Sequence, residues 1–150
     1  MKHSIVPITL DNVHEIRRYA KEFMATLNQP CDVDYYIGRW RVFIQTGVGI
    51  GWLAIVDDQC VGGIGGIVAP DILSGIPTMV ELFWYVTPKY RRYGILLYRE
   101  MERYVDMNNL RWAMIHMEGS MPDELTDFYQ HEQFNKLETH WVRERRVLCP

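Results

Sequence analysis

A long β-type segment that runs directly into a basic turn and then into a helix constrains this chain more than any other feature. Residues 78–86 alternate among large apolar side chains and end at Thr87-Pro88. Residues 89–93 then hold one lysine and two arginines, and Gly94 opens a stretch with apolar residues on one helical face. The pattern predicts a buried strand, a basic turn and a helix in succession. The unpaired N–H groups and the partial positive charge of that helix N-terminus would then lie beside the basic side chains.

Hydrophobic periodicity predicts the other elements. Pro7 makes the first strand an edge strand, since proline cannot donate to an inner ladder, and Asp11 is the expected N-cap of the first helix. The expected elements are a strand at 4–9, helices at 11–27 and 36–46, an antiparallel hairpin of 50–56 and 60–68, the strand and helix already described, a strand at 112–117, a helix at 122–131 and a last strand at 137–147. Their order, βααβββαβαβ, predicts an α/β (α+β) fold with a mixed, mainly antiparallel central sheet flanked by helices.

Four glycines at 62, 63, 65 and 66 imitate a nucleotide-binding glycine run. They lie within the predicted hairpin, and no helix opens after them, whereas a dinucleotide fingerprint requires one. We therefore interpret the run as a close-packed or bulged strand.

Length and composition exclude several classes of protein. At 150 residues the chain has the size of one ordinary domain, and we expect residues 1–150 to form a single domain. With 23% charged residues and a net charge of −3, no basic field points to general nucleic-acid binding. No run approaches the roughly 18 apolar residues of a membrane span. Three cysteines at unrelated spacings predict neither a disulfide framework nor a zinc site, so we expect no metal and a reducing, cytoplasmic setting.

The basic turn before Gly94 has two interpretations. A helix N-terminus flanked by cations suits a pyrophosphate group, which predicts a diphosphate-bearing cofactor. Basic residues in such a turn are also common on a solvated surface. The turn alone does not decide between the two.

The segment Val80–Ile95, VELFWYVTPKYRRYGI, resembles the core motif of the GNAT superfamily of acyl-CoA-dependent N-acetyltransferases. In that family a Val-x-Pro-x-x-Arg run leads into a Gln/Arg-x-x-Gly-x-Gly/Ala loop that holds the pyrophosphate of coenzyme A. The later stretch Phe128–Phe134, FYQHEQF, is similar to the family's Tyr-x-x-x-Gly-Phe signature, with Gln133 in place of the glycine. Because the order of elements also matches, the resemblance covers nearly the whole chain.

The pyrophosphate loop departs from the family pattern. If Lys89 takes the first motif position, Gly94 falls on the second glycine and Arg92 replaces the first, which implies a loop about two residues shorter than usual. A register that starts at Arg91 puts Leu96 where a small residue is usual and takes the helix face out of phase. A residue other than glycine at this position restricts the backbone φ angle and hinders close approach of the cofactor to the backbone. The resemblance therefore implies weaker cofactor binding than the family norm.

The resemblance implies acetyl-CoA as co-substrate and direct transfer within a ternary complex. In the family, the central strand splays from its neighbour and offers backbone groups to the pantetheine amides. The cofactor-binding residues that it implies are Trp84, Tyr85 and Val86 on the strand, and Lys89, Arg91, Arg92, Tyr93, Gly94 and Ile95 in the turn and helix start.

Two residues are candidates for catalysis. Glu81 lies among large apolar groups, where a buried carboxylate is costly without a role or a partner, and it is our candidate general base, directly or through a water. Its alternative is a carboxylate that faces solvent or pairs with an arginine. Tyr129 matches the family's tyrosine that protonates the departing thiolate. Its alternative is a half-buried packing residue.

The expected activity is acetyl transfer from acetyl-CoA to a small-molecule or peptide amine. In such folds the first two helices and the 71–77 loop shape the acceptor side, and Asp32 and Asp34 favour a cationic amine. The alternatives are a catalytically degenerate acyl-CoA-binding or protein-interaction module on the same fold, and a structural protein that shares only the fold. The apolar stretch 141–147 offers an edge for a homodimer.

Overall fold

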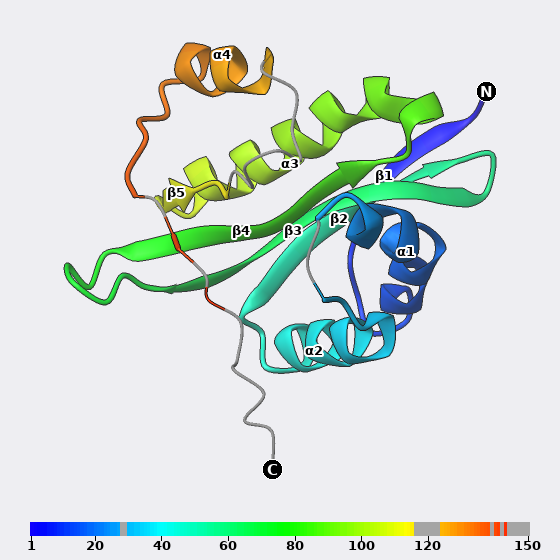
Figure 1. Ribbon diagram of the computed structural model, residues 1–150, viewed down its shortest axis with the longest axis horizontal. Helices are drawn as coiled ribbons and strands as arrows, with labels where there is room; N and C mark the ends of the chain where they lie inside the picture. Colours follow the sequence, from blue (N-terminus) through cyan, green and yellow to red (C-terminus); the bar gives the residue numbers. More distant parts are fainter. Residues whose placement is uncertain (28–29, 116–123, 139, 142, 144–150) are drawn as a thin grey trace. The chain divides into compact units, whose positions relative to one another are not determined.

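The computed structural model describes residues 1–27, 30–115, 124–138, 140, 141 and 143 (Figure 1). The chain divides into two compact units, residues 1–120 and 121–150, which we describe separately. None of the helices in the described ranges combines the length and the apolar character that crossing a membrane requires.

The first unit is built on a five-stranded sheet whose strands lie in the order β1-β2-β3-β4-β5. Neighbouring strands are antiparallel except for β4 and β5, which are parallel. Strand β1 lies at the edge of the sheet, as predicted from Pro7, but it ends at Pro7 instead of continuing to Thr9. The predicted mixed, mainly antiparallel sheet is therefore confirmed. The strands are β1 (His3–Pro7), β2 (Gly49–Val56), β3 (Gln59–Pro70), β4 (Pro77–Val86) and β5 (Arg111–Ala113).

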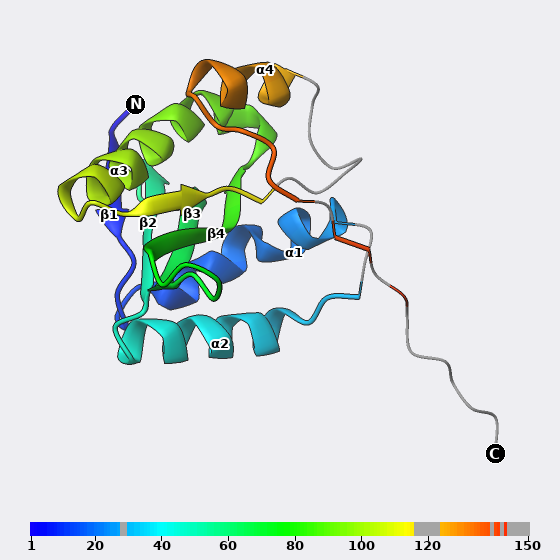
Figure 2. The same cartoon turned by 90° about the vertical axis from the view of Figure 1, so that its left-hand side faces the viewer.

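Helices cover both faces of this sheet (Figures 1 and 2). One face carries the 3₁₀ helix η1 (Val13–Ile16), α1 (Arg17–Ala25) and α2 (Val33–Gln45), and the other carries α3 (Gly94–Met107), which follows the 3₁₀ helix η2 (Pro88–Tyr93). Each face has its own apolar core: Trp40 of α2 packs on Phe83 in one, and Leu97 and Met101 of α3 pack with Met79 in the other. Strand β4 contributes to both.

The helices η1 and α2 start differently, and only α2 has a side-chain cap. Asp32 caps α2, where its side chain accepts a hydrogen bond from the backbone N–H of Tyr35 at 2.9 Å. Asp11, the predicted cap of the first helix, does not have that role. Asn12 stands at the start of η1 instead, and its side chain ties the N–H of Thr9 to the carbonyl of Pro7. This local bonding explains why the element begins as a 3₁₀ turn rather than as α-helix.

The glycines of β3 allow the neighbouring strand and the aromatic side chains of the core to approach closely, as expected. A Cβ on Gly65 would lie 2.6 Å from Cη2 of Trp40, and one on Gly66 would lie 2.3 Å from the carbonyl oxygen of Val80. The ladder is also bulged at this point, because Gly65 pairs with Phe83 whereas Gly66 pairs with Glu81. The extra residue in β4 is Leu82. Bulges change the direction of nearby side chains, and this one lies beside the candidate base.

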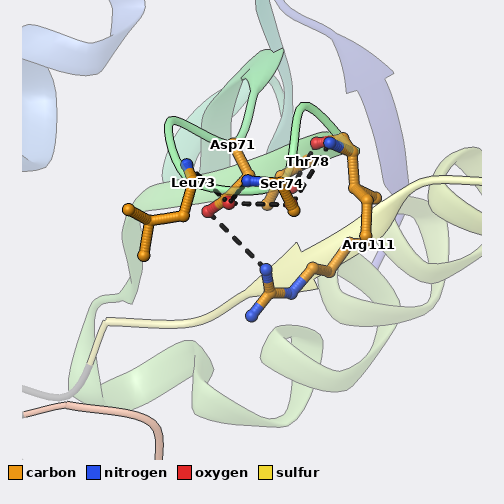
Figure 3. Close-up of polar contacts among 6 residues, drawn as sticks. Asp71, Leu73, Ser74, Thr78 and Arg111 are labelled. Carbon is orange, nitrogen blue, oxygen red and sulfur yellow. Dashed lines mark hydrogen bonds and ion pairs between the residues drawn. The ribbon is translucent and has the colours of Figure 1, made fainter.

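The loop between β3 and β4 is fixed by Asp71 (Figure 3). Its Oδ1 accepts hydrogen bonds from the N–H of Leu73 and from the N–H and hydroxyl of Ser74, at 3.1, 2.8 and 2.8 Å. These hydrogen bonds, those from Ser74 first, hold the pKa of Asp71 below its ordinary value. Arg111 on β5 places Nη1 3.6 Å from Oδ2 of Asp71, which joins the loop to the start of the β4–β5 pair.

The C-terminal predictions are met in part. Helix α4 (Glu124–His131) occupies most of the predicted 122–131 range, and β5 begins at Arg111 and ends at Ala113, so it is shorter than the predicted 112–117. Residues 116 and 117 lie outside the described residues. In the predicted last strand, the described residues 137, 138, 140, 141 and 143 are not in a strand, and the other positions lie outside the described residues.

Candidate active site

Strands β4 and β5 separate after three paired positions. The parallel ladder joins Thr78 to Arg111 and ends where Val80 pairs with Ala113. Two residues further along, the N–H of Ile115 donates to Oε2 of Glu81 at 3.0 Å instead of continuing the ladder. Within the described residues, the stretch of β4 from 81 to 86 has no strand partner on this side. Its backbone groups on that edge are therefore available to an extended ligand.

Glu81 lies at this point of separation and is 4% exposed. Burial raises the pKa of its carboxyl group to about 8, against the smaller opposing effect of the hydrogen bond from Ile115. Its charge also helps to raise the pKa of the Tyr36 phenol, for which burial is the main cause. A carboxyl group that titrates close to neutrality can take up a proton during a reaction at physiological pH.

A cleft of about 270 Å³ lies between the end of α1 and the start of α2. Leu82, the bulged residue next to Glu81, forms part of its wall, as does Tyr36, on which the charge of Glu81 acts. The cleft therefore borders the bulged part of β4 that follows Glu81, although Glu81 itself does not line it. Its lining is Phe23, Met24, Leu27, Pro30, Cys31, Asp32, Tyr35, Tyr36 and Leu82.

The predicted basic loop is folded as a 3₁₀ helix. Pro88 lies in the first turn of η2, the N–H of Tyr90 donates to the carbonyl of Thr87 at 2.8 Å, and η2 continues into α3. Gly94 has an ordinary helical φ of −58°, and a Cβ there would meet Nε1 of Trp84 at 3.6 Å, a normal contact. Its backbone conformation does not require glycine. Arg92 likewise lies within the 3₁₀ helix η2, a helical conformation that a residue with a side chain can adopt.

The four cofactor candidates of η2 differ in what they can offer. Lys89 and Arg91 are exposed, with Nζ of Lys89 5.1 Å from the ring centroid of Tyr90. Arg92 is engaged within the chain, since its Nη2 donates to the hydroxyl of Tyr93 at 2.9 Å. The Tyr93 side chain is buried in the core under α3. Lys89 and Arg91 are thus the cations best placed to meet an anion.

The remaining cofactor candidates lie on β4 and at the start of α3. Trp84 and Val86 belong to the core under α3, and Nε1 of Trp84 donates to the carbonyl of Gly94 at 3.2 Å. Tyr85 is on the opposite face, where burial raises the pKa of its phenol to about 12, Glu22 adds to the effect and Arg91 opposes it. Ile95 is exposed. The side chains of Trp84 and Val86 are structural, so a ligand at this strand would meet its backbone.

Tyr129 belongs to the second unit, in α4. Its ring lies 5.7 Å from that of Phe134, centroid to centroid, and its carbonyl accepts from the N–H of Phe134 at 2.9 Å. Gln133 has a positive φ of 67° in the turn that ends the helix. That conformation is the reason why a glycine is favoured at this position. Gln133 therefore adopts a strained backbone conformation in this turn.

Sequence reasoning did not single out Tyr36 or Leu82 as site residues. Tyr36 follows the helical period of core residues, and no local signal in the sequence marks the bulge at Leu82. Among the described residues, no group of three or more His, Cys, Asp or Glu side chains gathers in a way that could hold a metal ion.

Solved structures with this fold cover almost the entire chain. A ribosomal-protein-alanine N-acetyltransferase from Brucella melitensis biovar Abortus 2308 matches with a TM-score of 0.72 and 17% identity, over 97% of this chain and 100% of that one. A GCN5-related N-acetyltransferase from Ralstonia eutropha JMP134 matches with a TM-score of 0.74 and 14% identity, over 95% and 99%. A predicted acetyltransferase from Clostridium acetobutylicum, solved with acetyl-CoA, matches with a TM-score of 0.69 and 13% identity, over 96% of each chain.

No protein-family model and no curated protein sequence matches the chain. At identities of 13 to 17%, the likeness concerns the fold. The mixed five-stranded sheet and its flanking helices are thus those of a GNAT-like fold.

Proposed function

We propose that this chain, whose fold is that of the GNAT N-acetyltransferases, moves an acetyl group from acetyl-CoA to a primary amine by direct attack in a ternary complex. The observation that carries the proposal is the position of Glu81. Its buried carboxyl group, with a pKa of about 8, lies where β4 and β5 separate, and the next residue in the chain, Leu82, lines a cleft of about 270 Å³. The Brucella and Ralstonia proteins, which share this fold and are named as N-acetyltransferases, support the reaction class.

The chain offers groups suited to acetyl-CoA. The backbone of residues 84–86 suits the pantetheine amides, because the β4 edge has no strand partner there within the described residues. Lys89 and Arg91 suit the pyrophosphate, as exposed cations at the start of a helical turn. Arg92, Tyr93, Gly94 and Ile95 complete the proposed cofactor site, with Tyr93 offering only its backbone since its side chain is buried. Acetyl-CoA would supply an activated thioester.

Each catalytic candidate has one proton to move. Glu81 accepts the proton that the amine loses, either before attack or as the new C–N bond forms, directly or through a water. Tyr129 donates its phenolic proton to the sulfur as the C–S bond breaks, so that free CoA leaves as a thiol. The two transfers balance, and the products are an N-acetyl amide and CoA.

One structural feature favours a second candidate function. Where the family has a flexible glycine, Arg92 stands in a 3₁₀ helix and its guanidinium is occupied by Tyr93. A turn of this kind provides fewer free N–H groups for a pyrophosphate than an open loop does. A degenerate acyl-CoA-binding or protein-interaction module on the same fold is therefore the alternative.

A thermal-shift titration with acetyl-CoA, CoA and ATP, followed by free-thiol detection with a panel of amines, tests the proposal. A ligand that binds only the native state raises its melting temperature, so acetyl-CoA and CoA should raise it and ATP should not. Thiol release with an amine establishes transfer. Stabilisation without thiol release for any amine favours the degenerate acyl-CoA-binding module. No stabilisation by either coenzyme contradicts both acetyl transfer and acyl-CoA binding, and favours the protein-interaction module.

A charge substitution locates the pyrophosphate site. Gly94→Glu should weaken CoA binding by roughly 10-fold or more, because it places a negative charge near the phosphates. Gly94→Gln is the matched control, with the same size and no charge. If the two variants bind CoA equally well, the pyrophosphate does not bind near Gly94.

A further inference from the structure

The cleft beside Glu81 is apolar along most of its wall. Phe23, Met24 and Leu27 come from the end of α1 and the residues that follow it, and Leu82 comes from β4. Among the described residues that line the cleft, Asp32 is the only charged one. A ligand rich in hydroxyl groups would find few hydrogen-bond partners among these side chains. The walls instead suit a hydrocarbon body of modest size.

The charge of Asp32 is not neutralised by another described side chain. One carboxylate oxygen caps α2 through the N–H of Tyr35, and no salt bridge joins Asp32 to a described cation. Asp34, two residues on, differs in this respect because Arg17 binds it at 2.6 Å. The N-terminus of α2 contributes only about half a positive charge, so a net negative charge remains at Asp32.

Two other residues of the lining are related to Glu81: Leu82 directly follows it in β4, and the charge of Glu81 acts on Tyr36. With a pKa of about 8, the Glu81 carboxyl group is largely neutral at pH 7 and does not attract a permanent cation strongly. A ligand that suits the whole cleft therefore carries a cation at one end, a hydrocarbon body, and a second amine that can lose its proton at the other end.

We propose that the acceptor is a small diamine. One amino group is acetylated beside Glu81, the second stays protonated beside Asp32, and the carbon chain lies against the apolar wall. This inference rests on the proposed acetyl transfer, which it extends by naming the acceptor class. The reaction is unchanged: one N–H bond is replaced by an N-acetyl bond, and the far ammonium group is not altered.

The test compares 1,5-diaminopentane, pentylamine and 5-aminopentanol as acceptors in the thiol-release assay with acetyl-CoA. An exposed ion pair contributes modestly, so we expect kcat/KM for the diamine to exceed that for pentylamine by about 3- to 10-fold at low salt. The advantage should shrink at high salt, because screening weakens attraction between exposed charges.

Two matched variants separate charge from structure. Asp32→Ser keeps a capping side chain on α2 and removes the charge, so the diamine preference should fall to the factor of about two that two equivalent amines give. Asp34→Asn also removes one carboxylate, but outside the cleft, and it should retain the preference. A preference that persists in Asp32→Ser overturns the diamine assignment.

The outcomes distinguish this inference from the proposed function. Wild-type protein that acetylates pentylamine or 5-aminopentanol as well as the diamine, or better, overturns the acceptor class while the acetyl transfer stands. Thiol release with no amine overturns both. Melting temperatures of both variants within about 2 °C of wild type, measured with and without acetyl-CoA, establish that a changed preference is not a folding defect.

Discussion

The carboxylate of Glu81 accepts a hydrogen bond from the backbone N–H of Ile115 at 3.0 Å, just beyond the last paired residues of β4 and β5. A side chain thus replaces the carbonyl that a continuing ladder would supply. The bond satisfies the N–H where the strands diverge and holds the carboxyl group in position. The separation of the strands and the placement of the candidate base therefore have a common origin.

Glu81→Gln should lower kcat/KM by about 100-fold or more, since the amide cannot accept the proton of the amine. In the wild type, the rate should rise with pH through about 8 as the carboxylate forms. The variant should lose this dependence on pH near 8. It should keep only the rise in rate caused by deprotonation of the amine substrate, whose pKa is near 10 for an alkyl amine. A pH–rate profile of both proteins checks this, and an unchanged profile removes Glu81 as the base.

The same carboxyl group should make stability depend on pH. Its pKa is about 8 in the folded protein and near 4.5 when unperturbed, so between these values the folded state holds a proton that the unfolded chain has lost. Stability from this group is complete below about 4.5 and is lost as pH rises to about 8. Wild type should lose roughly 2 kcal/mol relative to Glu81→Gln between pH 6 and pH 8. Urea unfolding of both proteins at pH 6 and pH 8 measures the difference. An equal change in the free energy of unfolding of the two proteins would contradict the raised pKa.

The sheet and its helices could be predicted because local patterns determine them. The alternation from Thr78 to Val86 and the apolar face that begins at Gly94 are strong signals of a strand and a helix. Pro7 indicated the edge strand and the glycines of β3 indicated close packing, and the structure confirms both. The wrong cap at Asp11 has a local cause, since Asn12 hydrogen-bonds backwards to Thr9 and Pro7.

The site itself was less predictable. The sequence indicated Glu81 because a carboxylate among large apolar residues is unusual, but its hydrogen bond to Ile115 depends on where two strands separate. The cleft depends on the bulge at Leu82 and on the spacing of α1 and α2. Neither feature can be recognised from the hydrophobic periodicity of the sequence. Asp32 and Asp34 are equivalent in the sequence, and only the contact with Arg17 distinguishes them.

Tyr129→Phe should lower kcat by about 10- to 100-fold and leave acetyl-CoA binding nearly unchanged, because the ring is kept and only the proton donor is lost. Thiol-release kinetics and a thermal-shift titration with CoA measure the two effects. Phe128→Tyr is a suitable control, since it alters a neighbouring ring of α4 that is not a proposed proton donor. Equal turnover by Tyr129→Phe and wild type would mean that Tyr129 is a packing residue and not the proton donor.

Gly65→Ala tests the close packing that supports β4. A Cβ at residue 65 would lie 2.6 Å from Cη2 of Trp40 and 2.7 Å from Cε1 of Phe83, so the aromatic core must shift to admit it. Overpacking of this kind destabilises by about 1 to 3 kcal/mol. Because Phe83 lies two residues from Glu81 on the same strand, the shift should also reduce acetyl transfer.

Gly38→Ala is the matched control for that substitution. Nothing lies within 4 Å of a Cβ at this exposed position of α2, and alanine in a helix interior is favoured over glycine by about 0.5 to 1 kcal/mol. We therefore expect the two glycine-to-alanine changes to have opposite signs in urea unfolding. Equal destabilisation would mean that the aromatic packing around Gly65 is looser than these distances require.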